Sequence, residues 1–267
     1  MNKSKKEEKL ENKILNKLKG KPKKLAQLIF NDKEIQALQN HSNTVSINRL
    51  GFNDHGPVHM KKSALNSLVM FDLLKKENIN FNLEKEDIGE KKDSKIAVIF
   101  ASLIHDIGMS IGRDNHDLLS VTLADPIVKR LLNKIYPKNI FKRTIVKSTI
   151  LEGIIGHMGN HQTNSMEAGL VLIGDGCDME RGRARIPSLI STEPRAGDIH
   201  RFSASTITNL IIKKGQKKPI EIDVNMKETA GLFQIEKVLI PKITSSAVQD
   251  YIELYAIIEN NHTRRYI

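Results

Sequence analysis

Apolar residues in most of this chain recur three and four positions apart, which is the spacing of one face of an α-helix. The pattern runs from residue 31 to about residue 201 and is clearest from Ser63 to Leu74 and from Ile127 to Ile135. Between Lys75 and Lys95 the chain turns polar, and Asn, Gly and Asp interrupt the spacing. We therefore predict a helical region with a surface connection between two of its helices.

After about Phe202 the pattern changes to a period of two. Apolar residues alternate with polar ones at positions 220–225 and again at 252–258, as in half-buried strands. A β-branched stretch from Thr206 to Ile212 precedes them, with a turn at residues 214–216, and residues 232–239 have helical spacing. The sequence thus predicts a mainly α chain that ends in a small ββαβ unit. A unit of this size buries little surface alone, so it should pack on the helical region or on another chain.

The first 24 residues form a separate, strongly basic segment. Ten lysines and three glutamates give it a net charge of +7, out of +11 for the whole chain. Apolar residues at 10, 14, 15 and 18 predict an amphipathic helix from Lys5 to Lys19, ended by Gly20 and Pro22. We expect three parts: a lysine-rich helical segment (1–24), a helical domain (25–201) and a small α+β domain (202–267).

Composition excludes several classes of protein. With 39% hydrophobic and 27% charged residues in 267, the chain is not intrinsically disordered. Its longest apolar run, Ile96 to Ile104, is about half of the ~20 residues that a membrane span needs. A single cysteine, Cys177, allows neither an intramolecular disulfide nor a thiolate metal cluster. We expect a cytoplasmic protein without a membrane span, in which Cys177 is a buried apolar residue.

The basic N-terminal segment could contact RNA or an anionic membrane, or it could simply dock on the domain behind it. Nucleic-acid binding usually adds aromatic stacking platforms to the charge. The chain has no Trp, and its Phe and Tyr residues do not alternate with Lys or Arg. The sequence therefore favours docking, and nucleic acid is an allowed but less favoured partner.

A His-Asp pair ends the most apolar predicted helix. His105 and Asp106 follow the apolar run, and Ile107 and Gly108 come next. Two polar groups at the edge of a core need partners, because burying them without any costs several kcal/mol. A divalent metal would supply one, since imidazole nitrogen and carboxylate oxygen are both good ligands.

At this motif the sequence resembles the HD-domain superfamily of metal-dependent phosphohydrolases, whose ligand order is His, then His-Asp, then a distal Asp. His59, His105-Asp106 and Asp175 match that order, within residues 50 to 190. Members with two metals add histidines between the pair and the distal Asp, where His116 and His157 stand. The resemblance implies a helical HD-type domain with two divalent ions, Mn, Fe, Co, Ni or Zn. It also implies hydrolysis of a phosphomonoester or phosphodiester, with His105 and Asp106 as catalytic residues.

Other charged residues near these motifs are candidates for binding substrate phosphate or lining the pocket. The phosphate candidates are Lys62, Arg113, Arg181, Arg183 and Arg185, and a solvated basic loop is the alternative for the three later arginines. The pocket candidates are His55, His161 and Asp178. Gly197 to Arg201 could join the pocket or link the two domains. The subgroup that cleaves cyclic dinucleotides has Lys where Met109 stands and carries a Gly-Tyr-Pro motif, which is absent here, so its specificity does not carry over.

The expected substrate is a phosphorylated small molecule or a nucleotide, and we expect a homo-oligomer. Two other functions stay open at this stage. The chain could be a degenerate HD domain that holds a nucleotide as a regulatory module, or an RNA-binding protein that uses its basic N-terminus.

Overall fold

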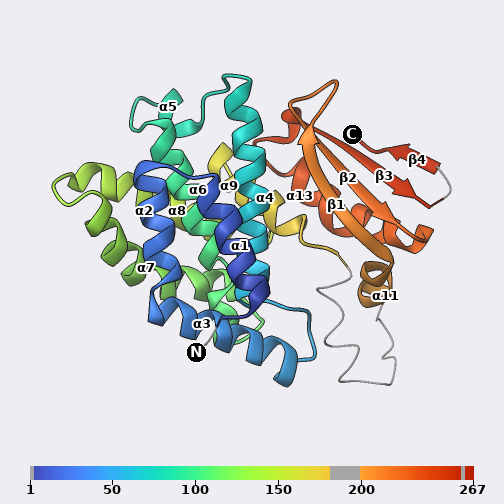
Figure 1. The fold of residues 1–267 in the computed structure, drawn as a ribbon, viewed down its shortest axis with the longest axis horizontal. Helices are drawn as coiled ribbons and strands as arrows, with labels where there is room; N and C mark the ends of the chain where they lie inside the picture. The colour runs from blue at the N-terminus through green and yellow to red at the C-terminus, as the bar shows by residue number, and fades with distance from the viewer. Residues whose placement is uncertain (1–2, 181–198, 260–261) are drawn as a thin grey trace.

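The chain folds into a helical body followed by a small sheet that is flanked by helices. Figure 1 shows the computed structural model, which describes residues 3–180, 199–259 and 262–267. As the sequence predicts, the protein is mainly α, and an α+β unit forms its C-terminal end. Among the described residues, no helix combines the length and the apolar character that crossing a bilayer requires.

The helical body contains the expected helices and several short turns. Its elements are α1 (Lys5–Asn16), α2 (Gly20–Phe30), α3 (Lys33–Thr44), η1 (Val45–Arg49), α4 (Pro57–Lys76), α5 (Asn82–Lys85), α6 (Lys91–Ile104), η2 (Ile107–Ser110), α7 (His116–Ile135), α8 (Ile140–Gly156) and α9 (Met166–Gly176). The polar connection predicted at 75–95 contains the short helix α5 and the first turn of α6.

The C-terminal unit begins with α11 (Ile199–Thr206) and contains one four-stranded sheet in the order β1-β2-β3-β4. Its elements are β1 (Ile207–Lys214), β2 (Ile220–Met226), η3 (Thr229–Gly231), α12 (Leu232–Gln234), η4 (Ile235–Leu239), α13 (Ile240–Thr244), η5 (Gln249–Tyr251), β3 (Ile252–Ile258) and β4 (His262–Arg265). β1 and β2 form the predicted hairpin, β3 lies parallel to β2, and β4 lies antiparallel to β3. The fourth strand was not predicted, so the unit is ββαββ.

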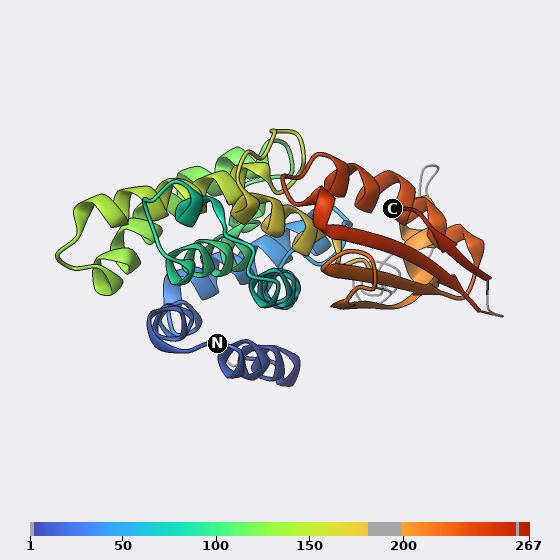
Figure 2. The same cartoon turned by 90° about the horizontal axis from the view of Figure 1, so that it is seen from above.

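The apolar positions of the alternation form the face of the sheet that joins the core, although the polar positions Glu221, Asp223 and Glu253 are buried as well. Ile222 on β2 pairs with Leu254 on β3, and both side chains are fully buried. Figure 2 shows the helical segment 232–244 lying along one face of the sheet. Ile235 and Leu239 of this segment join the same core as the helical body. The small unit therefore packs on the helical body, one of the two arrangements that its size predicts.

The helix that begins the chain docks on α4, as expected. Ile14 is fully buried, and Glu7 and Glu11 both pair with Lys61 of α4 at 2.9 Å. The predicted end of this helix was wrong in detail. Helix α1 ends at Asn16, and Gly20, with φ of +57°, begins α2 instead. Pro22 lies in the first turn of α2, where proline is tolerated because an N–H at that position would have no intrahelical partner.

Helices α4, α6 and α9 pack closely because small residues lie where they contact one another. Ser67 of α4 donates a hydrogen bond to the Leu170 carbonyl of α9, and Ser102 of α6 donates one to Ser67. A Cβ on Gly174 of α9 would overlap the Ser67 hydroxyl. This contact places the end of α9, with Asp175, beside the first turn of α4, with His59.

Candidate metal centre

Histidine and aspartate side chains from five helices converge inside the helical body. We call this cluster the candidate metal centre; it consists of His59 (first turn of α4), His105 and Asp106 (after α6), His116 (start of α7), His157 (after α8) and Asp175 (end of α9). Each of these side chains is buried. The structure thus brings together all six residues that the sequence marked as metal ligands.

The cluster contains two sets of donor atoms that could each hold an ion. In the first group, His59, His105 and Asp106 offer atoms within 4.8 Å of one another. The two Nε2 atoms of His59 and His105 are 3.3 Å apart, and Asp106 Oδ2 lies 3.3 Å from the former and 3.4 Å from the latter. Asp175 Oδ1 adjoins this group, 3.0 Å from His59 Nε2.

The second group consists of Asp106, His116 and His157. Asp106 takes part in both groups but with different oxygens. Its Oδ1 lies 3.3 Å from His116 Nε2 and 3.1 Å from His157 Nε2. The Nε2 atoms of His116 and His157 are 3.2 Å apart. The one carboxylate thus faces each group with one oxygen, which is the arrangement that a ligand bridging two ions requires.

The Nδ1 atoms of the four histidines all face away from the centre, toward hydrogen-bond acceptors. Their partners are Asp178 Oδ2 for His59 (2.7 Å), the Ser102 carbonyl for His105 (2.9 Å), the Arg113 carbonyl for His116 (2.9 Å) and the Ile154 carbonyl for His157 (2.6 Å). A carbonyl oxygen only accepts, so Nδ1 carries the proton and Nε2 of a neutral ring presents its lone pair to the centre. Metal-ligating histidines typically show this pattern of outer hydrogen bonds.

The donor set fits cations and is poorly satisfied without them. The Nε2 atoms of His116 and His157 face each other at 3.2 Å. Asp106 Oδ2 is buried and accepts no hydrogen bond of good geometry, although histidine nitrogens lie nearby. Burial of such atoms without partners is costly, and a positive ion between them would remove the cost.

The charges of the centre are strongly coupled. Burial opposes protonation of His105, but the carboxylates of Asp106 and Asp175 outweigh it and raise its pKa to about 9. Burial favours the neutral form of Asp106, yet the positive charges of His105 and His55 hold its pKa well below the usual value. Burial lowers the pKa of His157. A proton on His105 thus partly replaces the positive charge that a metal would bring.

The residues expected to line the pocket have different surroundings. His55 is buried, and its Nε2 lies 3.2 Å from the Arg113 guanidinium. Asp178 lies beside the centre: its carboxylate contacts the Nδ1 of His59 at 2.7 Å, and its backbone N–H donates to the Asp175 carbonyl at 2.9 Å. His161 is at the surface, with 56% of its side chain exposed and Asp117 3.8 Å away, and the structure does not bring it into the cluster.

Two of the expected phosphate ligands are described. Arg113 is partly buried and stacks on the Phe52 ring, 5.1 Å from its centroid. Lys62 pairs with Asp178 (3.0 Å) and Glu180 (2.6 Å), so its charge is already shared by two carboxylates. Arg181, Arg183, Arg185 and the 197–198 part of the predicted linking segment lie outside the described residues.

One residue at the centre gave no signal in the sequence. Lys242 of α13 donates hydrogen bonds to Asp175 and to the His157 carbonyl. It stands 67 positions after Asp175 in a short amphipathic helix, where a lysine is ordinary. Only the packing of the C-terminal unit on the helical body reveals the contact.

Cys177 is fully buried, and burial raises the pKa of its thiol, as expected of an apolar core residue.

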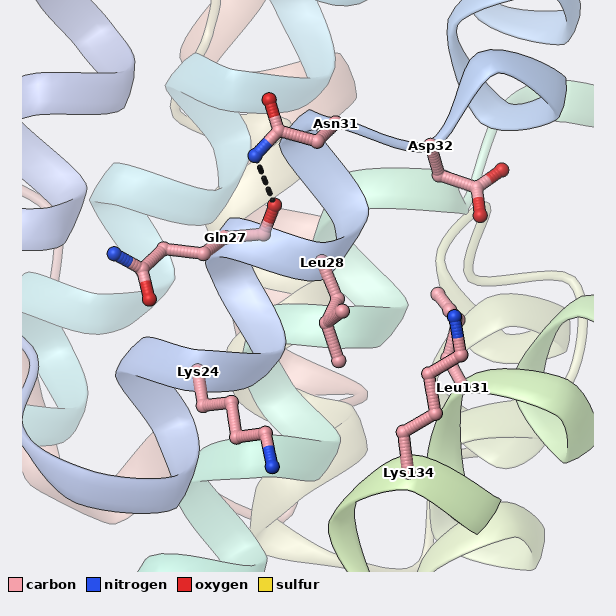
Figure 3. Close-up of a pocket in the computed structure, with 7 residues that line it drawn as sticks. All are labelled: Lys24, Gln27, Leu28, Asn31, Asp32, Leu131 and Lys134. Carbon is pink, nitrogen blue, oxygen red and sulfur yellow. Dashed lines mark hydrogen bonds between the residues drawn. The ribbon is translucent and has the colours of Figure 1, made fainter.

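A surface pocket elsewhere in the helical body holds no comparable chemistry. Figure 3 shows it between α2 and α7, lined by Lys24, Gln27, Leu28, Asn31, Asp32, Leu131 and Lys134. No residue of the metal centre lines it. Its carboxylate, Asp32, is paired with Arg130 at 2.6 Å, and the Asn31 amide donates to the Gln27 carbonyl. The pocket therefore has no free acidic group to offer a ligand.

Comparison with known proteins gives the chain a relative. Over 245 residues it is 36% identical to the uncharacterized protein MJ1020 of the archaeon Methanocaldococcus jannaschii, and the match covers 92% of each chain. The chain belongs to the family of that archaeal protein. No family model and no solved structure matches the chain. Because this relative is uncharacterized, only the metal centre points to a function.

Proposed function

We propose that this protein is a metal-dependent phosphohydrolase of the HD type, with two divalent ions held at the buried centre. The observation that carries the proposal is the position of Asp106 between two groups of histidine donors, whose Nε2 atoms all face inward. His59, His105, Asp106 and Asp175 would hold one ion. Asp106, His116 and His157 would hold the other. Histidine and carboxylate ligands without thiolate suit Mn, Fe, Co, Ni or Zn.

The charge of the donor set favours an anionic substrate. Asp106 and Asp175 are the carboxylates among the proposed ligands, and together they cannot neutralise two divalent cations. Bound ions would supply Lewis acidity, a bound water of lowered pKa and charge stabilisation at a phosphoryl group. A phosphoester is a substrate class that uses all three. The chain need not supply a nucleophile, and Cys177 is buried away from such a role.

The protein residues have the tasks of holding ligands and binding phosphate. The outer acceptors fix each histidine ring with Nε2 inward, so that the donor positions exist before an ion arrives. Arg113, beside His55 and with its carbonyl on His116, is our main proposal for binding phosphate oxygens. Lys62, Arg181, Arg183 and Arg185 are further proposals for this task.

Hydrolysis assays test the proposal. Purified protein with Mn²⁺ should hydrolyse p-nitrophenyl phosphate or bis(p-nitrophenyl) phosphate, and His105→Ala and Asp106→Ala should reduce the rate to that of the metal in buffer. His41→Ala is the matched control, since His41 is exposed on α3 and should leave the rate unchanged. Activity that survives both substitutions at the centre would contradict the proposal.

RNA binding through the N-terminal helix is a second candidate, supported by how its charges are arranged. Glu7 and Glu11 pair with Lys61, and Lys3 pairs with Glu11, so these acids are neutralised against the body. The exposed side of α1 is left with several lysines, namely Lys5, Lys6, Lys9 and Lys13. A double substitution of Lys9 and Lys13 to Glu should weaken RNA binding and flatten its salt dependence. Equal RNA binding by the variant would exclude this surface.

A further inference from the structure

A buried ammonium group of the C-terminal unit contacts the metal centre. Lys242 lies on α13, and only 9% of the residue is exposed. Its Nζ donates to Asp175 Oδ2 and, at 2.8 Å, to the carbonyl oxygen of His157. These two partners belong to different parts of the centre. Asp175 adjoins the first group of donors, and His157 is a member of the second group.

The contact with Asp175 orients its carboxylate. Because Oδ2 accepts from Lys242, the other oxygen, Oδ1, faces the first group, 3.0 Å from His59 Nε2 and 3.6 Å from His105 Nε2. The contact with the His157 carbonyl restrains the backbone at the C-terminal end of α8, which carries the His157 ring. One ammonium group thus contacts the Asp175 carboxylate and the His157 backbone, and it helps to position both donor groups.

The position of Lys242 is fixed by the packing of α13 on the helical body. Ile243, its neighbour, is fully buried in the common core. Gly176 leaves space for the lysine stem, because a Cβ at that position would come to 3.0 Å from Lys242 Cδ. The ammonium therefore cannot move far from the centre unless α13 moves with it.

A second, independent connection joins the centre to the edge of the sheet. Asp178 binds the Nδ1 of His59 with one oxygen and Lys62 with the other, at 2.7 and 3.0 Å. Lys62 also pairs with Glu180, which accepts a hydrogen bond of 3.1 Å from the backbone N–H of Leu210 in β1. Both α13 and β1 of the C-terminal unit therefore contact groups that position metal donors.

We propose that Lys242 is a positioning residue through which the C-terminal α+β unit completes the metal centre, so that metal binding and the seating of α13 are coupled. The inference rests on the proposed function and adds a regulatory element to it. Any ligand or partner that shifted the C-terminal unit would change metal affinity, and metal would in turn hold the unit in place.

If Lys242 acted only through its charge, its removal would change metal affinity in the direction opposite to that expected of a positioning residue. A positive charge beside a cation site repels the cation, so removing it would tighten metal binding. If Lys242 acts by positioning Asp175 and His157, its removal weakens binding instead. The direction of the change separates the two roles, and a lysine that only stabilised the fold would leave metal affinity of the folded protein unchanged.

The first test is Mn²⁺ titration of the full chain by electron paramagnetic resonance, with circular dichroism as a check of folding. Lys242→Met keeps the apolar stem and removes the ammonium, and it should weaken Mn²⁺ binding at least about tenfold. Lys237→Met is the matched control, because Lys237 is exposed in η4 of the same helical segment, and it should bind as the wild type does. Unchanged or tighter binding by Lys242→Met would overturn the inference and leave the proposed function standing. A wild type that binds no Mn²⁺ would overturn both.

The second test uses the wild type and does not depend on the variant folding. Hydrogen exchange of backbone amides is measured with and without Mn²⁺. Because coupling is reciprocal, the amides of residues 240 and 242–244 should exchange more slowly when metal is bound. Protection confined to the helical body, with no change in α13, would overturn the inference.

Discussion

Gly108 lies directly against the backbone of His116, so closely that a Cβ on Gly108 would overlap the His116 carbonyl oxygen. The N–H of Gly108 donates to the Ser120 hydroxyl, one turn further along α7, at 2.8 Å. This contact places the start of α7 beside the His-Asp pair and allows His116 Nε2 to approach Asp106 Oδ1. The glycine two residues after Asp106 is therefore part of how the second donor group forms.

Substituting Gly108 should damage the second donor group selectively. Gly108→Ala forces α7 away from Asp106, and overpacking of this kind costs about 1–3 kcal/mol of unfolding free energy. We expect the variant to bind one Mn²⁺ where the wild type binds two, measured by titration, with reduced stability in urea. Gly112→Ala is the control, since nothing lies within 4 Å of its Cβ position. Two ions in Gly108→Ala would show that the contact is not needed.

The carboxylate behind His59 should be needed for metal affinity even though it would touch no ion. Asp178→Asn replaces the anionic acceptor of His59 Nδ1 with a neutral one, and loss of such outer partners typically weakens metal binding about 10–100-fold. Isothermal titration with Mn²⁺ or Zn²⁺ measures the change. Asp114→Asn, at an exposed position before α7, should have no effect. A change of less than twofold at Asp178 would argue against the role of the outer hydrogen bond.

Metal binding should release a proton near neutral pH. In the metal-free protein the pKa of His105 is raised to about 9, so the ring is protonated at pH 7, whereas a metal ligand must be neutral. Metal affinity should therefore increase with pH from 7 to about 9. The same shift stabilises the metal-free protein fully below pH 6.5, the ordinary pKa of His, and this contribution is lost as pH rises through about 9. Calorimetry in buffers of different ionisation enthalpy counts the protons, and affinity that does not vary with pH would contradict the assignment of His105 as a ligand.

The cysteine should be inert in the native protein. Cys177 is fully buried, and burial raises the pKa of its thiol, so little thiolate forms. We expect Ellman's reagent to label it slowly in buffer and completely in guanidinium chloride. Rapid labelling of the native protein, followed by absorbance, would show that the region around Cys177 opens far more readily than its packing implies.

The sequence predicts the elements whose signals are local. Period-two alternation identified β2 and β3, and an apolar run ending in His105 and Asp106 identified the end of α6. Pro57 lies in the first turn of α4, where proline is favoured, so that His55 lies outside this helix and His59 inside it. These predictions succeed because the residues that a helix or strand turns toward the core are apolar and recur at a regular spacing in the sequence.

The features that were not predicted depend on contacts between distant residues. Strand β4, at residues 262–265, has no apolar alternation and forms by pairing with the free edge of β3. Lys242 looks like any surface lysine until α13 packs on α9. Gly20 and Pro22 are helix-breaking residues in general, but here they start α2. In each case the local sequence allows more than one structure, and tertiary packing determines which one forms.

Anomalous X-ray diffraction from Mn²⁺-soaked crystals tests directly whether Asp106 bridges two ions, as we propose. We expect two anomalous peaks about 3.5–4 Å apart. One should lie against His59, His105 and Asp175, the other against His116 and His157, with Asp106 touching both. A single peak, or a metal-free cluster in which the histidine Nε2 atoms are hydrogen-bonded among themselves, would contradict it.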